Sequence, residues 1–457
     1  MTAVEQRDPA LAAEGANLPP GPRSPGLWQM SRWFRDPVRF MEANRARHGP
    51  IFTVRLGALK RCAFIADPQA AWKILSGDPA TFRMGPTNAI FRPVLGNQSL
   101  FLLDGEEHKR HRRLIAPSFH RQAVRGYADL IGEITSRDMA SWPVGTPFPL
   151  QDSMRRITTE SITRIVIGVC DPDRDAQIRR LVPEMLEIAE NPLALMPQFQ
   201  REMGGRSPFG QVMRVTREID RILLDEIALR RHRRGAEVGS DVLSALARPE
   251  PHEDSFMTDR EIRDEMLTLL IAGHETTANT LSWAFERLLR HPEALDRVIT
   301  DEGDEYLDAV VRETLRQRPI LPVTARRLTV PMEVGGYSFP AGWTLMPCIY
   351  LIHSDPDVFP DADVWRPERF IGDSRPSSRV WIPFGAGSRH CIGSHLALLT
   401  IKTVLRTVLA KARLEADGAP EEIVRNNMTL APGRGATVTM LGSRGSRVRG
   451  IRTGVHD

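Results

Sequence analysis

The chain has 457 residues, of which 41% are hydrophobic, 26% charged and 6% aromatic, and its formal net charge is +4. This composition is typical of a globular protein long enough to bury a core around a cofactor, and so few aromatic residues argue against a nucleic-acid stacking surface. Residues 443–457 hold four arginines and one aspartate, so this tail carries a net charge of +3 and leaves +1 for the rest.

The two ends of the chain are predicted to be flexible, with one domain between them. Residues 1–17 contain no apolar run and no signal-peptide pattern. The Gly/Ser/Arg-rich residues 443–457 have the composition of a disordered, solvated basic tail. No stretch reaches the roughly 18 apolar residues of a membrane-spanning helix. We therefore expect a soluble, cytoplasmic protein with a single domain at residues 18–442, no transmembrane anchor and no nucleic-acid partner.

Short extended segments occur at two places in the chain. Residues 18–26 (LPPGPRSPG) are predicted to form a stiff, extended entry segment. Apolar and polar residues alternate in 51–57 and 61–66, which indicates a hairpin. Residues 333–343 (EVGGYSFPAGW) predict a second short hairpin that turns at its Gly-Gly pair.

Residues 67–300 indicate helices separated by short Pro/Gly breaks, and the longest of them begins near Thr258. Thr258 and Glu261 have the spacing of a capping box. The apolar pattern continues to Arg290, before His291 and a proline end it. A helix of about 33 residues would cross a whole domain. These elements predict a fold that is mainly α with small β-sheets (α+β).

The middle of this long helix carries polar residues inside an apolar stretch. The segment AGHETTANT contains Glu275 and Thr276, and both threonine and glycine weaken a helix. Polar, poorly helical residues in a buried helix indicate a functional site. The alternative is that the threonine hydroxyls bond back to carbonyls of their own helix.

A glycine-rich loop surrounds Cys391. In FGAGSRHCIG, glycines allow positive φ and close backbone approach, and a helix pattern starts directly after the loop. Loop amides and the positive end of that helix are expected to lower the pKa of the thiol and to favour thiolate, the form that binds metals. A zinc site of His390, Cys391 and His395 is the alternative, but adjacent ligands are awkward at one metal and no second ligand cluster appears.

The remaining cysteines give no sign of a disulfide framework. Cys62, Cys170 and Cys348 are scattered, and none of the four cysteines lies in a CxxC pair. This usage favours a reducing compartment.

Four sequence elements together resemble the cytochromes P450. The loop at 384–393 matches the family's haem-binding signature F-x-x-G-x-R-x-C-x-G at every fixed position, and AGHETT at 272–277 matches its oxygen-activation segment. ETLR at 313–316 and WRPERF at 365–370 match two further elements in the family's order. The resemblance implies a single-domain cytochrome P450 fold with a long central helix, in which haem b is buried against the helix that follows the cysteine loop.

The resemblance also assigns residues that would hold the haem, with Cys391 as the axial iron ligand. Buried propionates need cationic partners. The matching cationic side chains are His108, Arg112, Arg326 (with Arg327 as its alternative) and Arg389. Residues expected to enclose the sulfur are Phe384, Gly387 and Gly393, and the alternative for Phe384 is an ordinary core aromatic. The small residues expected to leave room for O2 are Ala272 and Gly273.

Two further roles follow from the resemblance. Glu275 and Thr276 would hold O2 and an ordered water and relay protons to the oxygen, while His274 is assigned no role. A buried cluster of carboxylate and guanidinium groups would support the region behind the cysteine loop. Its members are Glu313, Arg316 and Arg369.

The expected activity is O2-dependent hydroxylation or epoxidation of an apolar small molecule. Fatty acids and terpenoids are favoured, and steroids and polyketides stay open. The pocket would be lined from residues 84–100, about 190–210, the central helix and 321–324. The segment NPLALMPQF at 191–199 fits an apolar pocket and plain helix packing equally well.

Electrons are expected from separate proteins, since no G-x-G-x-x-G follows a strand. The partners would be a ferredoxin or flavodoxin and its NAD(P)H-dependent reductase, docking on a basic face that includes Lys109, Arg110 and Arg113. The protein is expected to be a monomer. One alternative is a haem-thiolate peroxygenase or isomerase, which tends to lack the acid–alcohol pair. The other is a non-enzymatic haem sensor or carrier, which needs no proton relay.

Overall fold

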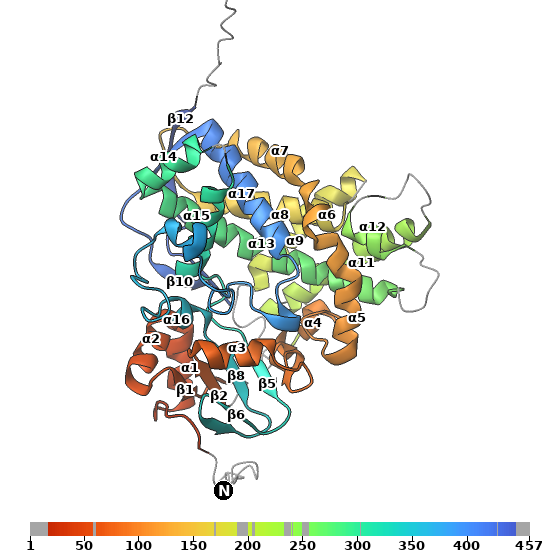
Figure 1. Cartoon of the computed structure of the whole chain (residues 1–457). Helices are drawn as coiled ribbons and strands as arrows, with labels where there is room; N and C mark the ends of the chain where they lie inside the picture. The colour runs from red at the N-terminus through yellow and green to blue at the C-terminus, as the bar shows by residue number, and fades with distance from the viewer. Residues whose placement is uncertain are drawn as a thin grey trace, which may run out of the picture.

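Helices form most of the molecule, and its largest sheet lies at the end where the described chain begins (Figure 1). The computed structural model describes residues 17–57, 61–168, 171–189, 200–202, 206–232, 239, 241–248, 256–301, 303–426 and 428–444. The predicted fold class, mainly α with small sheets, is confirmed.

The helices and strands are identified by the following bounds. The α-helices are α1 Gly26–Arg35, α2 Pro37–His48, α3 Pro68–Ser76, α4 Arg92–Leu95, α5 Gly105–Ile115, α6 Arg121–Arg125, α7 Ala128–Met139, α8 Leu150–Val166, α9 Pro172–Ala189, α11 Pro208–His232, α12 Val242–Leu246, α13 Asp259–Leu289, α14 Pro292–Thr300, α15 Glu305–Gln317, α16 Ile349–His353 and α17 Ser394–Lys411. The strands are β1 Ile51–Val54, β2 Cys62–Ile65, β3 Phe82–Arg83, β4 Pro147–Pro149, β5 Arg326–Leu328, β6 Met332–Val334, β7 Tyr337–Phe339, β8 Thr344–Pro347, β9 Ala412–Ala416, β10 Ile423–Asn426, β11 Thr429–Pro432 and β12 Thr437–Ser443.

The strands form four small sheets. The largest has the order β1-β2-β8-β5-β3, and the others are β4-β12-β9, β10-β11 and β6-β7. Both predicted hairpins are confirmed, since β1 pairs antiparallel with β2 and β6 with β7. Gly335 and Gly336 join β6 to β7 with φ of 57° and 78°, a turn that only glycine adopts without strain.

Helix α13 is the centre of the main hydrophobic core and packs against α8, α11, α15 and α17. The predicted capping box is confirmed, because Thr258 Oγ1 accepts the Glu261 N–H and the Glu261 carboxylate accepts the Thr258 N–H. The helix ends at Leu289, one residue before the predicted end at Arg290. Residues on most of its circumference are buried, so its position is fixed from several sides.

Helix α5 is held against the first turns of α13 by charged groups. Arg110 donates to Glu261 over 2.7 Å and to the carbonyl of Phe256. The buried ring of His111 lies 2.7 Å from Glu265 and 3.2 Å from Glu261. The prediction that Arg110 belongs to a solvent-facing basic surface is therefore wrong, because its guanidinium joins two helices. Lys109 and Arg113 are exposed.

Candidate functional site

The loop before α17 is shaped by close backbone packing. Gly387 has φ of 65°, and a Cβ at this residue would lie 2.3 Å from the carbonyl oxygen of Leu75 in α3. Only glycine fits there, as the glycine pattern predicts. The Cys391 N–H donates to the carbonyl of Phe384 over 2.9 Å, which closes the loop. Gly393 differs, because it is the N-cap of α17 with φ of −88° and has no need for a positive φ.

The side chain of Cys391 is accessible, although protein surrounds it. The thiol is exposed, yet desolvation by the surrounding protein raises its pKa. The Gly393 N–H and the positive charge of Arg112 oppose this effect but do not outweigh it. The prediction of a lowered thiol pKa is therefore wrong for the protein alone. A bound cation would supply the missing stabilisation of the thiolate.

The other described cysteines differ from Cys391. Cys62 and Cys348 are buried, and desolvation raises the pKa of both thiols, in Cys62 to about 12. Cys170 lies outside the described residues. Across the described chain, no three His, Cys, Asp or Glu side chains gather as metal ligands, so the zinc alternative lacks its ligand set.

Cationic side chains from three segments converge near Cys391. Buried His108 on α5 is close enough to Arg112, Arg326 and Arg389 that, after desolvation, their charges lower its pKa, to about 3. Desolvation and the charge of Arg389 also lower the pKa of Arg326, to about 10. Strand alternation buries Arg326 and exposes Arg327, so Arg326 is the member of the pair that joins the cluster.

The charge of this cluster fits a group with two carboxylates. At neutral pH His108 is uncharged, whereas the three arginines carry three positive charges. The carboxylate that interacts with them is Asp104, which forms an ion pair with Arg389 at 2.5 Å. Two positive charges are left over, and the two propionates of a haem would balance them. Because Arg112 also acts electrostatically on Cys391, the same group would adjoin the sulfur.

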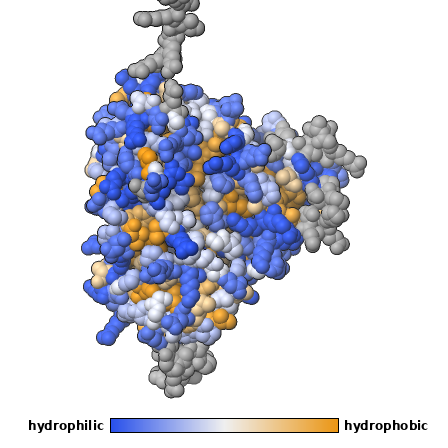
Figure 2. Space-filling view, viewed as in Figure 1, coloured by the Kyte–Doolittle hydropathy of each residue, from blue (hydrophilic) through white to orange (hydrophobic). Residues whose placement is uncertain are grey.

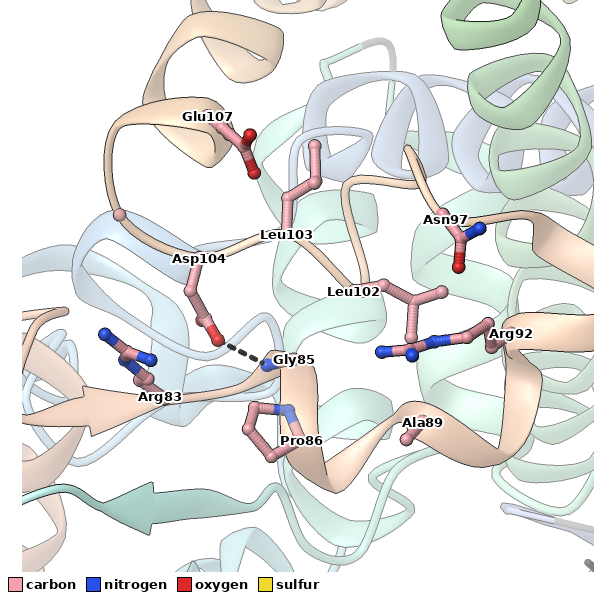
Figure 3. A pocket seen from close by; sticks show the side chains of 11 residues that line it. Arg83, Gly85, Pro86, Ala89, Arg92, Asn97, Leu102, Leu103, Asp104 and Glu107 are labelled. Carbon is pink, nitrogen blue, oxygen red and sulfur yellow. Dashed lines mark hydrogen bonds between the residues drawn. The ribbon is translucent and has the colours of Figure 1, made fainter.

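Asp104 also forms the wall of a surface groove of about 650 Å³. Its carboxylate accepts the N–H groups of Met84 and Gly85 at 3.0 and 3.1 Å, in addition to the Arg389 guanidinium. Figure 3 shows Arg83 and Arg92 on opposite sides of this groove. Most of the residues that line the groove lie in the segment 84–100 or just after it. The segment 84–100 is part of the predicted substrate-binding region.

The middle of α13 is a partly accessible stretch between buried turns. Residues 271–273, Glu275 and Thr276 are partly accessible, whereas the turns before and after them are buried. The Thr276 hydroxyl donates to the Ala272 carbonyl over 2.8 Å, so the alternative of a threonine bonded to its own helix describes this structure. A Cβ at Gly273 would lie 2.7 Å from Ile162 of α8. Gly273 therefore lets two helices approach on this side, and it is also partly accessible, so its expected role in leaving room for O2 stays a prediction.

Glu275 takes part in a hydrogen-bond chain that runs between three elements. Its carboxylate accepts the Thr429 hydroxyl of β11 over 3.1 Å. Thr429 Oγ1 also accepts the side-chain N–H of Asn279 over 3.2 Å, and Asn279 accepts from Gln151 of α8 over 2.6 Å. Asn279 and Gln151 are buried, so this chain gives the partly accessible carboxylate a fixed support.

The structure brings the three members of the carboxylate–guanidinium cluster together. Glu313 receives two bonds from Arg316, at 2.7 and 2.8 Å, and one from Arg369 at 3.4 Å. Arg316 also donates to the carbonyls of His353 and Ala362, each over 2.9 Å. All three side chains are buried, and the cluster fixes the segment that precedes the cysteine loop.

Phe384 lies in the cysteine loop, and His274 lies on the central helix. The half-buried ring of Phe384 lies edge-on to Trp381, with centroids 6.2 Å apart, and 6.3 Å from the ring of His390. His274 is buried against α8, where its carbonyl accepts the Thr158 hydroxyl, and desolvation lowers its pKa to about 4.

Sequence reasoning missed the residues that support the site from a distance. Asp104 could have been suspected, since an acid directly before a helix rich in basic residues is well placed to pair with a cation. Thr429, Asn279 and Gln151 carry no local signal, because the residues they join lie more than 120 positions apart.

Comparison with known proteins identifies the class of protein that these features define. The family model described as cytochrome P450 matches residues 19–440. Cytochrome P450 135B1 of Mycobacterium tuberculosis is 36% identical over 437 residues, which cover 93% of this chain and 92% of that protein. Cytochrome P450 138 of the same species is 36% identical over 436 residues, covering 94% and 98%. The chain belongs to the cytochrome P450 family, and it is accordingly a haem-thiolate monooxygenase that binds haem b.

Solved structures share the fold. A retinoic acid-bound cyanobacterial CYP120A1 superposes with a TM-score of 0.81 at 23% identity, covering 94% of this chain and all of that one. The haem domain of cytochrome P450DA gives a TM-score of 0.80 at 22% identity, covering 93% and 98%. Among the described helices, none has the length and apolar character needed to cross a bilayer.

Proposed function

We propose that Cys391 is the axial thiolate ligand of the haem and that Arg112, Arg326, Arg389 and His108 bind its propionates. The observation that carries this proposal is the charge balance beside an accessible cysteine. Three guanidinium groups face one carboxylate, and the excess of two positive charges matches the two propionates. Neutral His108 would add a hydrogen bond to them. Phe384 and Gly387 would shape the loop that holds the sulfur, and Gly393 would donate its N–H to it.

When bound, the haem supplies the iron at which O2 is activated for insertion into the substrate. We propose that Glu275 and Thr276 handle the protons that this reaction consumes. The Thr276 hydroxyl donates a hydrogen bond to the Ala272 carbonyl in this structure and keeps its oxygen lone pairs free to accept. Glu275 lies next to it on the accessible part of α13 and is linked to Thr429, so it can take up a proton and pass it to the neighbouring hydroxyl or to a bound water.

The proposed substrate is an apolar small molecule that is hydroxylated or epoxidised, with fatty acids and terpenoids as the favoured classes. Support comes from the groove at residues 83–107. Leu102 and Leu103 line the inner side of the groove, and the two arginines at its rim would suit a substrate that carries a carboxylate at one end. The predicted pocket segment at 191–199 lies outside the described residues.

We propose that electrons come from a separate ferredoxin or flavodoxin. A depression of about 260 Å³ beside the cysteine loop is lined by Trp72, Phe384 and His390, among others. Lys109 and Arg113 are exposed and would form part of the surface on which an acidic partner docks. Arg110 is not part of that surface. Reduction by such a partner should slow at high ionic strength, and salt-independent reduction would exclude an electrostatic docking site.

The absorption spectrum of the reduced, CO-bound protein tests the assignment of the ligand. The wild-type protein should give the spectrum of a thiolate-bound haem, and Cys391→Ser should lose it. Cys348→Ser is the control, because Cys348 is buried in a separate core cluster and should leave the spectrum unchanged. Retention of the thiolate spectrum by Cys391→Ser would overturn the assignment. A subsequent screen for compounds that shift the spin state of the resting enzyme would identify the substrate class.

A further inference from the structure

Helix α1 presents large apolar side chains to the outside. Leu27 is 75% exposed, Trp28 66% and Phe34 41%, and the first two are the most exposed large hydrophobic residues of the described chain. Gln29 and Trp33, on the opposite face, are buried. Single exposed apolar residues are common on protein surfaces, but three on one helix of ten residues form a patch.

The helical spacing divides this outward face into an apolar and a mixed flank. Leu27 and Phe34 are seven residues apart and share one flank, whereas Trp28, Arg32 and Arg35 follow at i, i+4 and i+7 on the other. The rings therefore lie next to guanidinium groups on a surface that faces away from the core.

The surroundings of α1 are strongly basic. Between residues 23 and 39 there are four exposed arginines and one acid. That acid, Asp36, accepts the Arg39 N–H over 2.9 Å and caps α2. None of the four guanidinium groups forms an ion pair with a carboxylate in the described part of the chain. Their charge is therefore available to a partner. They are Arg23, Arg32, Arg35 and Arg39.

The β10–β11 hairpin extends the apolar surface. The Arg425 guanidinium lies 4.3 Å from the centroid of the Phe34 ring, and it donates to the Trp33 carbonyl over 3.2 Å, which fixes the hairpin against α1. Val424 is 39% exposed and Met428 50%. In Figure 2, apolar residues reach the surface over the region where Figure 1 places α1 and β10.

We propose that the α1 face, formed by Leu27, Trp28, Phe34, Val424 and Met428 with the surrounding arginines, docks on the surface of an anionic phospholipid bilayer. Apolar and aromatic side chains at the headgroup boundary, together with arginines that bind anionic lipid, are the features of a helix that lies on a membrane. A second copy of this chain fits less well, because a two-fold interface through this face would bring arginines against arginines. Aliphatic Leu27 and Met428 offer no stacking surface to a nucleic acid.

Co-sedimentation of the full-length protein with vesicles tests this proposal. The protein should bind vesicles of phosphatidylcholine mixed with phosphatidylglycerol, and bind much less to phosphatidylcholine alone. Leu27→Ser/Trp28→Ser should weaken partitioning at least about tenfold. Arg32→Gln and Arg35→Gln should each weaken it about fivefold. Leu229→Ser/Val364→Ser removes exposed apolar side chains elsewhere and should bind like the wild type.

The same variants separate the proposal from its rivals. The basic residues after 443 are unchanged in all of them, so full binding by Leu27→Ser/Trp28→Ser would overturn the proposal and assign the binding to the tail. Absence of wild-type binding to anionic vesicles would also overturn it, as would binding that appears only after removal of residues 1–16. A concentration-dependent dimer that Leu27→Ser/Trp28→Ser abolishes would instead assign the face to self-association. Circular dichroism checks that each variant is folded.

Discussion

The hydroxyl oxygen of Thr429 lies 3.1 Å from the carboxylate of Glu275 and 2.8 Å from the carbonyl oxygen of Asn426. A hydroxyl has one proton and can donate to only one of them at a time. Ionised Glu275 would accept the hydrogen bond from this hydroxyl. Protonated Glu275 could instead donate to Thr429, which would then turn its own proton to Asn426. The orientation of one hydroxyl is thus coupled to the protonation of the proposed acid.

Thr429→Val should keep the fold and the haem but reduce product formed per electron about tenfold, because Glu275 loses a hydrogen bond to its charged form. The electrons would appear as peroxide, measured by comparing product and peroxide with NAD(P)H consumed. Thr437→Val is the matched control, since Thr437 also donates to the carbonyl three residues earlier, over 2.8 Å. If both variants formed the same amount of product per electron, Thr429 would have no part in the proton relay.

Thr276→Ala should retain the haem and waste electrons. The product formed per electron should fall at least about tenfold, because the hydroxyl that accepts protons beside Glu275 is lost. Thr280→Ala is the control, since Thr280 makes the same bond to its own helix one turn later, to the Thr276 carbonyl over 2.8 Å. Unchanged coupling in Thr276→Ala would show that the hydroxyl only serves the helix.

Glu313→Ala should prevent stable haem incorporation. The change leaves two buried guanidinium groups without their carboxylate, which costs about 3–5 kcal/mol. Haem content per protein and the free energy of unfolding are the measurements. Glu368→Ala removes a half-exposed carboxylate that pairs with Arg297 and should change both little. A soluble Glu313→Ala protein with full haem content would contradict the structural role.

Acid should destabilise the fold through His353. Burial, with the nearby charge of Arg316, lowers the pKa of this histidine from 6.5 to about 3. The unfolded chain therefore binds the proton more readily, so this stabilisation is complete above pH 6.5 and is lost as the pH falls towards 3. The slope from one such group is at most about 1.4 kcal/mol per pH unit.

Unfolding measured across this pH range checks the effect of His353. His353→Gln should show a shallower slope than the wild type, although His108 and His274 act in the same direction. His120→Gln, a change at an exposed histidine, should leave the slope unchanged. Equal slopes in both variants would exclude His353 as the titrating group.

Local sequence predicted what depends on local geometry. The capping box of α13, the two hairpins and the positive φ of Gly387 follow from residues a few positions apart. Residues in separate motifs, such as Glu313 and Arg369, were placed together because the family resemblance links them. The sign of the Cys391 pKa shift could not be predicted, because it depends on how much protein surrounds the thiol.

Contacts between distant segments also escaped prediction. The sequence does not show that Gly273 lets Ile162 of α8 approach α13 closely. Arg110 looks solvent-facing because its neighbours are, yet a helix 150 residues later supplies its carboxylate. Thr429 is an ordinary strand residue in the sequence, and only the packing of β11 on α13 gives it a neighbour to support.

The three donors that share the Asp104 carboxylate constrain how this enzyme could be redesigned. Because the same side chain holds the Met84–Gly85 backbone and the Arg389 guanidinium, the groove wall and the cofactor-binding loop are mechanically joined there. Mutant libraries aimed at new substrates can vary Pro86, Ala89 and Arg92 on the far wall independently of cofactor loading. In a library that also varies residue 104, a screen for activity would first select the variants that retain haem, and only then those with a new substrate preference.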